Sequence, residues 1–112
     1  MTLFQNLINR ELPADIVYED DEVFAFRDIA PQAPTHILII PKKKITRIDE
    51  AQVSDAPLLG KLLLTAAKIA LELDLKANGY RLVINNGKDA GEAVPHLHIH
   101  LLAGRKLAWP PG

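Results

Sequence analysis

The segment from Pro95 to Ala103 reads PHLHIHLLA, and no other stretch constrains the fold of this chain as strongly. Its histidines alternate with aliphatic residues, and successive side chains of a β-strand point to opposite faces. We therefore expect a strand with a buried aliphatic face, whose other face presents the imidazoles of His96, His98 and His100 in a row. Such a strand needs neighbouring strands and a covering layer to bury its apolar side.

Two helices are expected, and the longer one can cover one face of the sheet. Thr2 and Gln5 have the spacing of a capping box, ahead of a short amphipathic helix that stops at Pro13. A long helix is expected to begin at Ser54 or Asp55 and to end near Gly79. Its apolar stripe consists of Leu58, Leu59, Leu62, Ala66, Ile69, Ala70 and Leu73.

Four further segments are expected to be strands. The β-prone runs 16–18 and 23–26 flank an acidic turn, a pattern typical of a hairpin. Two more strands are expected at 35–40 and 80–85. Hairpin-like connections outnumber helical crossovers, so the expected fold class is α+β, with a five-stranded, mostly antiparallel sheet. A chain of 112 residues has room for one domain, which we expect to span 1–112.

Composition restricts the partners and the location. With 13 basic and 14 acidic residues the formal net charge is −1, so no global field attracts nucleic acid or an anionic membrane. Any anionic ligand must then be met by a local site. The absence of cysteine excludes disulfides and thiolate nucleophiles. The N-terminus does not resemble a secretory signal, and charged residues interrupt the longest apolar stretch, so we expect a cytoplasmic protein.

The histidine row has three interpretations: unrelated solvated side chains, a metal site, or catalysis at phosphorus. All three imidazoles cannot share one ion, because His96 and His100 would lie about 13 Å apart along a strand. Two of them together with His36 could still hold zinc, although Asp89 and Glu92 are the only carboxylates close by in sequence.

Catalysis at phosphorus agrees better with the neighbouring sequence. A neutral imidazole attacks phosphorus directly and forms a bond labile enough for water to displace. The loop 85–91, which precedes the histidines, contains two glycines and two asparagines. Glycine-rich turns expose backbone N–H groups that cradle anions, so this loop is expected to contact a phosphate.

The pattern from His96 to Leu102 resembles the signature of the histidine triad (HIT) superfamily of nucleotide hydrolases and transferases. Segments 26–43, 79–81 and 109–112 resemble the histidine triad nucleotide-binding (Hint) branch of that superfamily, so that the resemblance covers nearly the whole chain. It implies that His98 is the nucleophile, that His100 contacts the phosphate and leaving group, and that His96 and His36 support them. Asp28 matches the acidic residue that holds the ribose hydroxyls.

The resemblance also implies a set of nucleotide contacts. The purine is clamped by apolar residues, the phosphate lies near the loop before the triad, and a C-terminal tryptophan reaches the partner's site. The full set of expected contacts is Leu3, Phe4, Leu7, Phe26, Arg27, Asp28, Ile29, Leu38, Asn85, Gly91, Glu92, Ala93, Val94 and Trp109.

The implied activity is hydrolysis of the P–N bond of adenosine or guanosine phosphoramidates, through a nucleotidyl-histidine and without a metal cofactor. The implied ligands are purine nucleoside monophosphates and their phosphoramidates, and the implied assembly is a homodimer whose sheets join across the two-fold axis. A nucleotide-binding regulatory module with incidental hydrolysis and a histidine-ligated metal protein remain alternatives. Lys44, Glu92-Ala93 and Pro95 depart from the branch pattern, so we expect a different leaving-group preference.

Overall fold

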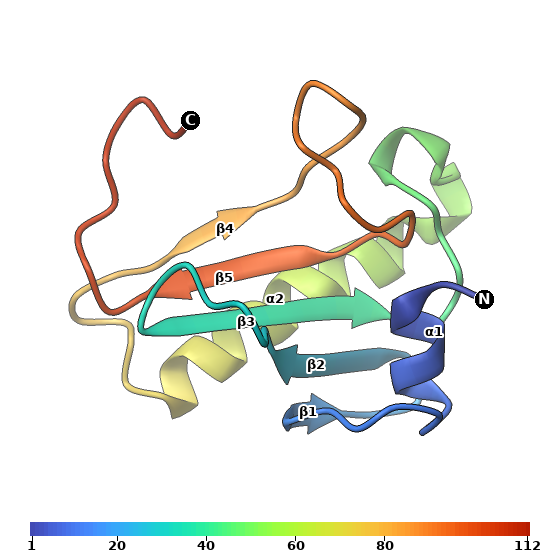
Figure 1. The fold of residues 1–112 in the computed structure, drawn as a ribbon, viewed down its shortest axis with the longest axis horizontal. Coiled ribbons are helices and arrows are strands. Elements are labelled where there is room, and N and C mark those ends of the chain that lie inside the picture. Colours follow the sequence, from blue (N-terminus) through green and yellow to red (C-terminus); the bar gives the residue numbers. More distant parts are fainter.

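Five antiparallel strands form one sheet in the order β1-β2-β3-β5-β4 (Figure 1). The computed structural model describes all residues from 1 to 112. The strands are β1 (Ile16–Glu19), β2 (Val23–Arg27), β3 (Thr35–Pro41), β4 (Arg81–Val83) and β5 (Ile99–Ala103). The helices are α1 (Leu3–Ile8) and α2 (Ala56–Glu72), preceded by two 3-10 turns, η1 (Ile48–Glu50) and η2 (Val53–Asp55). The predicted α+β class and five-stranded sheet are confirmed.

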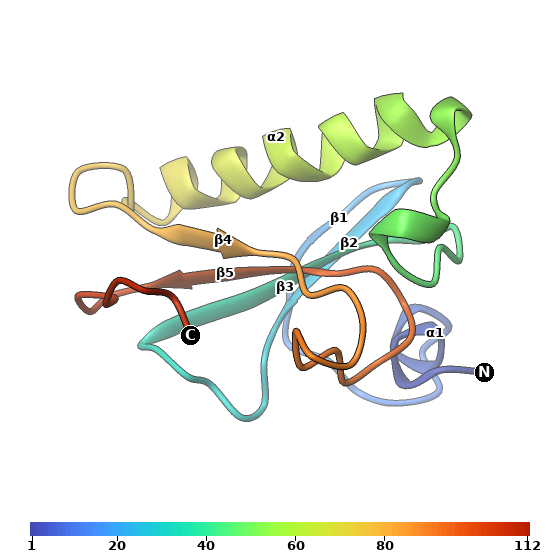
Figure 2. The same cartoon turned by 90° about the horizontal axis from the view of Figure 1, so that it is seen from above.

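Helix α2 covers one face of the sheet, and α1 lies on the other (Figure 2). The larger core lies under α2, because strand alternation sends Ala25, Ile37 and Ile99 to that side. The predicted helical stripe is also there, as buried or partly buried residues. The buried members of this core are Val23, Ala25, Ile37, Ile39, Ile45, Leu58, Leu62, Ala66, Ile69, Ala70, Leu97, Ile99 and Leu101.

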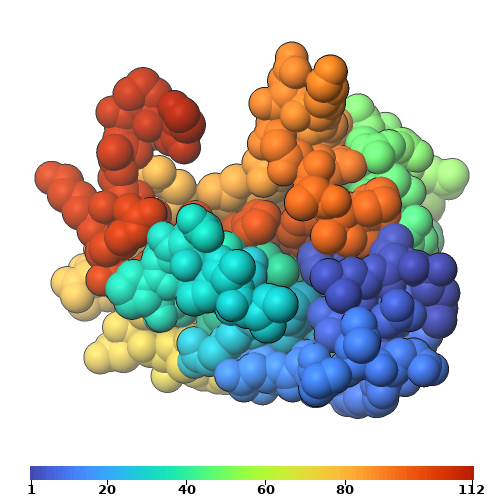
Figure 3. Space-filling view, in the orientation of Figure 1, coloured from blue at the N-terminus to red at the C-terminus, as the bar shows by residue number.

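The opposite face of the sheet is covered by α1. Thr2 and Gln5 form the predicted capping box, which satisfies N–H groups that a six-residue helix cannot pair internally. A second core consists of Phe4, Leu7, Phe24, Phe26, Leu38 and Ile40. The space-filling view in Figure 3 shows this face, with α1 in dark blue beside the orange segment that follows β4.

The predicted histidine strand is shorter than expected, because β5 begins at Ile99 and not at Pro95. Ahead of β5 the backbone N–H of Leu97 donates to Ile45 O at 2.7 Å, outside the sheet ladder. The alternation nevertheless continues, since Leu97 lies in the core under α2 while His96 and His98 lie on the opposite side. The expected open row of imidazoles is wrong, because α1 buries two of them: His96 is 0% exposed and His98 is 6% exposed.

Two other boundaries differ from the sequence prediction. Strand β4 covers only Arg81–Val83 of the predicted 80–85, since its pairing with β5 ends at His100. Helix α2 ends at Glu72, well before Gly79, because Asp74 adopts a left-handed conformation (φ 60°) and Leu75 N–H bonds back to Ala70 O. Neither helix combines the length and apolar character needed to cross a membrane.

Truncating Leu62 to alanine is expected to destabilise the fold by about 2–5 kcal/mol, because this side chain is 1% exposed between α2 and the sheet. Leu64→Ala on the same helix is the matched control, since Leu64 is 73% exposed. Urea unfolding of both variants measures the difference. Equal midpoints for the two variants would contradict the packing described here.

Candidate active site

Four histidines from three segments meet on the face that α1 covers. His36 extends from β3 and His100 from β5, and their ring centroids lie 5.2 Å apart. The ring of His98 lies 4.9 Å from that of His100 and 5.0 Å, edge-on, from that of Phe4. The first helix therefore forms one wall of the histidine cluster.

Hydrogen bonds to backbone carbonyls fix the tautomers of two of these imidazoles. His98 Nδ1 lies 2.7 Å from His96 O, and a carbonyl oxygen only accepts, so Nδ1 carries the proton. The Nδ1–H tautomer of His98 thus has its lone pair on Nε2. His96 Nε2 donates in the same way to Pro41 O at 2.8 Å, and its buried Nδ1 has no partner. His96 is therefore a buried supporting residue, which bonds to Pro41 O through its ring and to His98 Nδ1 through its carbonyl.

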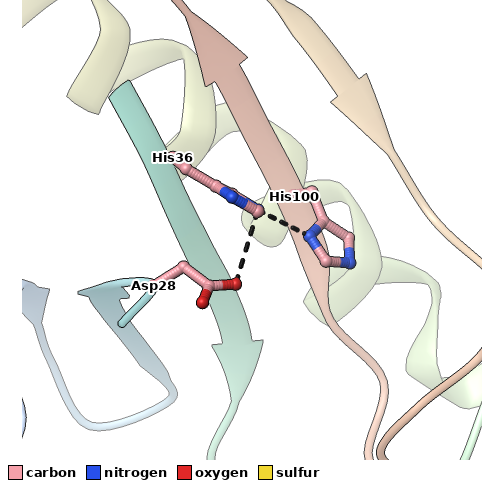
Figure 4. A group of neighbouring side chains, drawn as sticks. All are labelled: Asp28, His36 and His100. Carbon is pink, nitrogen blue, oxygen red and sulfur yellow. Dashed lines mark hydrogen bonds and ion pairs between the residues drawn. The ribbon is translucent and has the colours of Figure 1, made fainter. Parts of the chain in front are cut away.

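A second chain of hydrogen bonds fixes His36 and His100 (Figure 4). The backbone N–H of Gln32 donates to His36 Nδ1 at 3.0 Å, which leaves the proton of His36 on Nε2. This Nε2–H donates to His100 Nδ1 at 2.9 Å and lies 3.5 Å from Asp28 Oδ2. His100 Nδ1 is therefore an acceptor, and its proton is carried by Nε2.

Burial keeps three of the four imidazoles neutral. It is the main cause that lowers the pKa of His36, of His96 and of His100, whose pKa falls to about 4. For His100 the neighbouring His98 and His36 lower the pKa further, whereas Asp28 raises it. At physiological pH His100 is a neutral N–H donor.

Beside the histidines lies a cavity of about 460 Å³, within the range of small-molecule sites. Twelve of the expected site residues line it: Leu3, Phe4, Leu7, Phe26, Arg27, Asp28, Ile29, Leu38, Ala93, Val94, His98 and His100. Sequence reasoning missed Leu12, Pro13 and Ala14, which also line it. In the sequence these three residues look like an ordinary helix end. They are recognised as cavity residues only once α1 is seen to lie over the site.

The other expected residues lie outside this lining. His36 and His96 stand behind it as supports for His100 and His98. Trp109 is 81% exposed on the C-terminal tail, and Asn85, Gly91 and Glu92 lie in the segment between β4 and the cavity-lining Ala93.

The loop glycines do not offer the expected anion cradle. Gly87 N–H donates to Glu92 Oε1, and Gly91 N–H donates to Lys88 O. The backbone N–H groups of Ala93 and Val94 have no protein acceptor, and both residues line the cavity. These are the better candidates for contacts to an anion at this end.

Comparison with known proteins identifies the family. The model of the HIT domain matches residues 9–107. The chain belongs to the HIT family. It is 60% identical over 111 residues to an uncharacterized HIT-like protein of Synechococcus elongatus, covering 99% of this chain and 96% of that one.

Solved HIT structures share the fold. A HIT family hydrolase from Legionella pneumophila is 48% identical, with a TM-score of 0.98 and complete coverage of both chains. A histidine triad nucleotide-binding protein from Candida albicans is 30% identical with a TM-score of 0.84, over 98% of this chain and 83% of that one. The resemblance noted in the sequence to the HIT superfamily is thereby confirmed.

The HIT cluster also contains a possible metal-ligand set that sequence proximity did not reveal. Ligand atoms of Asp28, His36 and His100 all lie within 4.8 Å of one another. Asp28 is distant in sequence from the histidine row and joins it through the loop between β2 and β3. A zinc ion here would have to displace the proton shared by His36 and His100, because nitrogen ligands bind zinc deprotonated.

The stability of this HIT fold is expected to fall as pH decreases from about 6.5 to about 4. An unfolded histidine is protonated below its ordinary pKa, whereas folded His100, with a pKa of about 4, stays neutral. The unfolded state then binds more protons, so this group contributes a slope of at most about 1.4 kcal/mol per pH unit. Urea titrations of wild type and His100→Gln between pH 4 and 7 measure it. Equal slopes for the two proteins would contradict the burial effect.

Proposed function

We propose that this chain is a metal-independent hydrolase that cleaves the P–N bond of purine nucleoside phosphoramidates. One observation carries the proposal: the Nε2 lone pair of the Nδ1–H tautomer of His98 and the Nε2–H of neutral His100 belong to adjacent rings lining one cavity. A nucleophile beside a hydrogen-bond donor is the arrangement that displacement at phosphorus requires. The similar proteins named as a hydrolase and as a nucleotide-binding protein support the same chemistry.

In the first step His98 Nε2 attacks phosphorus, and the bond from phosphorus to the amine nitrogen breaks. The imidazolium so formed keeps its Nδ1–H bonded to His96 O, which stabilises the new positive charge. Because His100 is neutral, it donates a hydrogen bond to a phosphate oxygen, and the departing amine takes its proton from a water molecule.

In the second step the hydroxide left by that proton transfer attacks phosphorus from the solvent side. The bond between phosphorus and His98 breaks, the nucleoside monophosphate leaves, and the Nε2 lone pair is restored. The net reaction consumes one water molecule and needs no redox partner.

The remainder of the cavity suits a purine nucleoside. Its lining is mainly apolar, and Phe4, Phe26 and Leu38 provide flat or broad surfaces for a base. Asp28 lines the same cavity, and its carboxylate can accept hydrogen bonds from both hydroxyls of a ribose. The proposed order along the cavity is base, ribose at Asp28, and phosphate at His98 and His100.

We further propose a cytoplasmic homodimer. Strand β4 pairs only with β5, so its other edge has unpaired backbone groups that a second copy can use. The same dimer would bring the exposed Trp109 of one protomer toward the cavity of its partner. A regulatory module would bind the same nucleotides without turnover, and a metal enzyme would depend on Asp28, His36 and His100.

Substitution of His98 by alanine is expected to abolish hydrolysis of adenosine phosphoramidate, because no other lone pair is held toward the phosphate. Rapid-quench mass analysis of the wild type should detect one added nucleoside monophosphate on His98. Phe24→Leu, in the core beside α1, is the folding control. Turnover that survives in His98→Ala would contradict the mechanism, and loss of wild-type turnover on chelation would favour the metal alternative.

Replacement of Asp28 by alanine is expected to weaken binding of adenosine monophosphate by about a hundredfold, because two hydrogen bonds to a charged group are lost. The affinity for the 2′-deoxy analogue should fall less, since one hydroxyl is already missing. Calorimetric titration of both ligands measures the difference. Equal losses for the two ligands would exclude the ribose role of Asp28.

A further inference from the structure

A bidentate ion pair lies behind the phosphate end of the cavity. Arg47 Nε lies 2.9 Å from Glu92 Oε1, and Arg47 Nη2 lies 3.0 Å from Glu92 Oε2. The side chain of Glu92 is 10% exposed and that of Arg47 is 29% exposed. Arg47 also contacts Glu50 in η1. The forked geometry and the partial burial distinguish this pair from surface pairs, which contribute little.

The ion pair organises the loop between β4 and the histidines. Glu92 Oε1 accepts a hydrogen bond from Gly87 N–H at 3.1 Å, and Glu92 N–H donates to Gly87 O at 3.1 Å, so Glu92 closes the turn. Asn86 and Asp49 exchange two further hydrogen bonds, each 3.0 Å long. Residues 86–92 are therefore attached to residues 47–50 at two points.

The closed turn leads directly into the cavity wall. Ala93 and Val94, which follow Glu92, line the cavity together with His98. Hydrogen bonds from Arg47 and from Gly87 N–H are the main causes that lower the pKa of Glu92. Glu92 is thus an anion one residue before the cavity-lining Ala93, and Arg47 is the cation that balances it.

We propose that Arg47 and Glu92 are positioning residues for the phosphate end of the site. The pair holds the backbone N–H groups of Ala93 and Val94 at the cavity wall, and Arg47 neutralises a carboxylate that would otherwise repel the phosphate. This inference rests on the proposed nucleotide site and adds a determinant of its affinity for anions.

The test compares Arg47→Met, Glu92→Gln and the double variant in hydrolysis of adenosine phosphoramidate. Arg47→Met should raise KM about tenfold and change kcat less, because it leaves an uncompensated anion near the phosphate. Added salt should reduce this rise by screening the repulsion. The double variant should recover much of the loss, since glutamine is neutral and can still accept from Gly87 N–H.

Lys61→Met is the matched control. Lys61 pairs with Asp20 and Glu22 outside the cavity lining, so its loss should leave KM unchanged. Arg47→Lys keeps the charge without the fork, and its KM should be intermediate. The melting temperature of each variant distinguishes this role from a purely structural one. If the role were purely structural, KM would change in parallel with the melting temperature and would not depend on salt.

A KM of Arg47→Met within twofold of wild type would overturn the inference, as would a double variant no better than Arg47→Met. Calorimetric affinities for adenosine monophosphate separate this failure from failure of the proposed activity. If the wild type binds adenosine monophosphate but does not hydrolyse the phosphoramidate, the proposed activity is wrong. The affinities of the variants for adenosine monophosphate then still test the role of Arg47. A wild type that does not bind the nucleotide overturns both.

Discussion

The contact between Phe4 and the imidazole of His98 is the interaction on which the site depends. It places a six-residue helix over the face of the sheet that carries the histidines, and the capping box of Thr2 and Gln5 makes so short a helix possible. Without burial His96 and His100 would titrate near their ordinary pKa. With it, His96 and His100 remain neutral, so the site presents lone pairs and N–H groups instead of positive charges.

Peptide groups, rather than a catalytic carboxylate, decide where the protons of the cluster reside. The carbonyl of His96 holds the proton on His98 Nδ1, and the amide of Gln32 holds the proton of His36 on Nε2. In a neutral imidazole, a proton on one ring nitrogen leaves a lone pair on the other. The bond to His96 O therefore leaves a lone pair on His98 Nε2, and the chain through His36 leaves an N–H on His100 Nε2. Backbone groups cannot change protonation state, so they favour the same tautomer whenever these rings are neutral.

The sequence predicts the alternation of the histidine segment well, because side-chain period is a local property of extended backbone. It does not predict which imidazoles are buried, since burial of His96 and His98 depends on α1, about 90 residues earlier in the chain. The resemblance assigns Asp28, His36 and His100 to one site, but the sequence does not predict that their ligand atoms lie within 4.8 Å of one another. The end of α2 at Glu72 is missed because an aspartate, Asp74, adopts the left-handed conformation that usually indicates glycine after a helix.

The cavity, like the whole chain, has little excess of positive charge. Arg27 is the only lysine or arginine in the lining, and its Nε lies 3.8 Å from Asp15 Oδ2, so it is partly balanced. A phosphate in the proposed position would be held mainly by neutral donors, namely His100 Nε2–H and the amides of Ala93 and Val94. Neutral donors orient an anion without the long-range attraction of several cations, so a charged product can leave once the bond to phosphorus has broken.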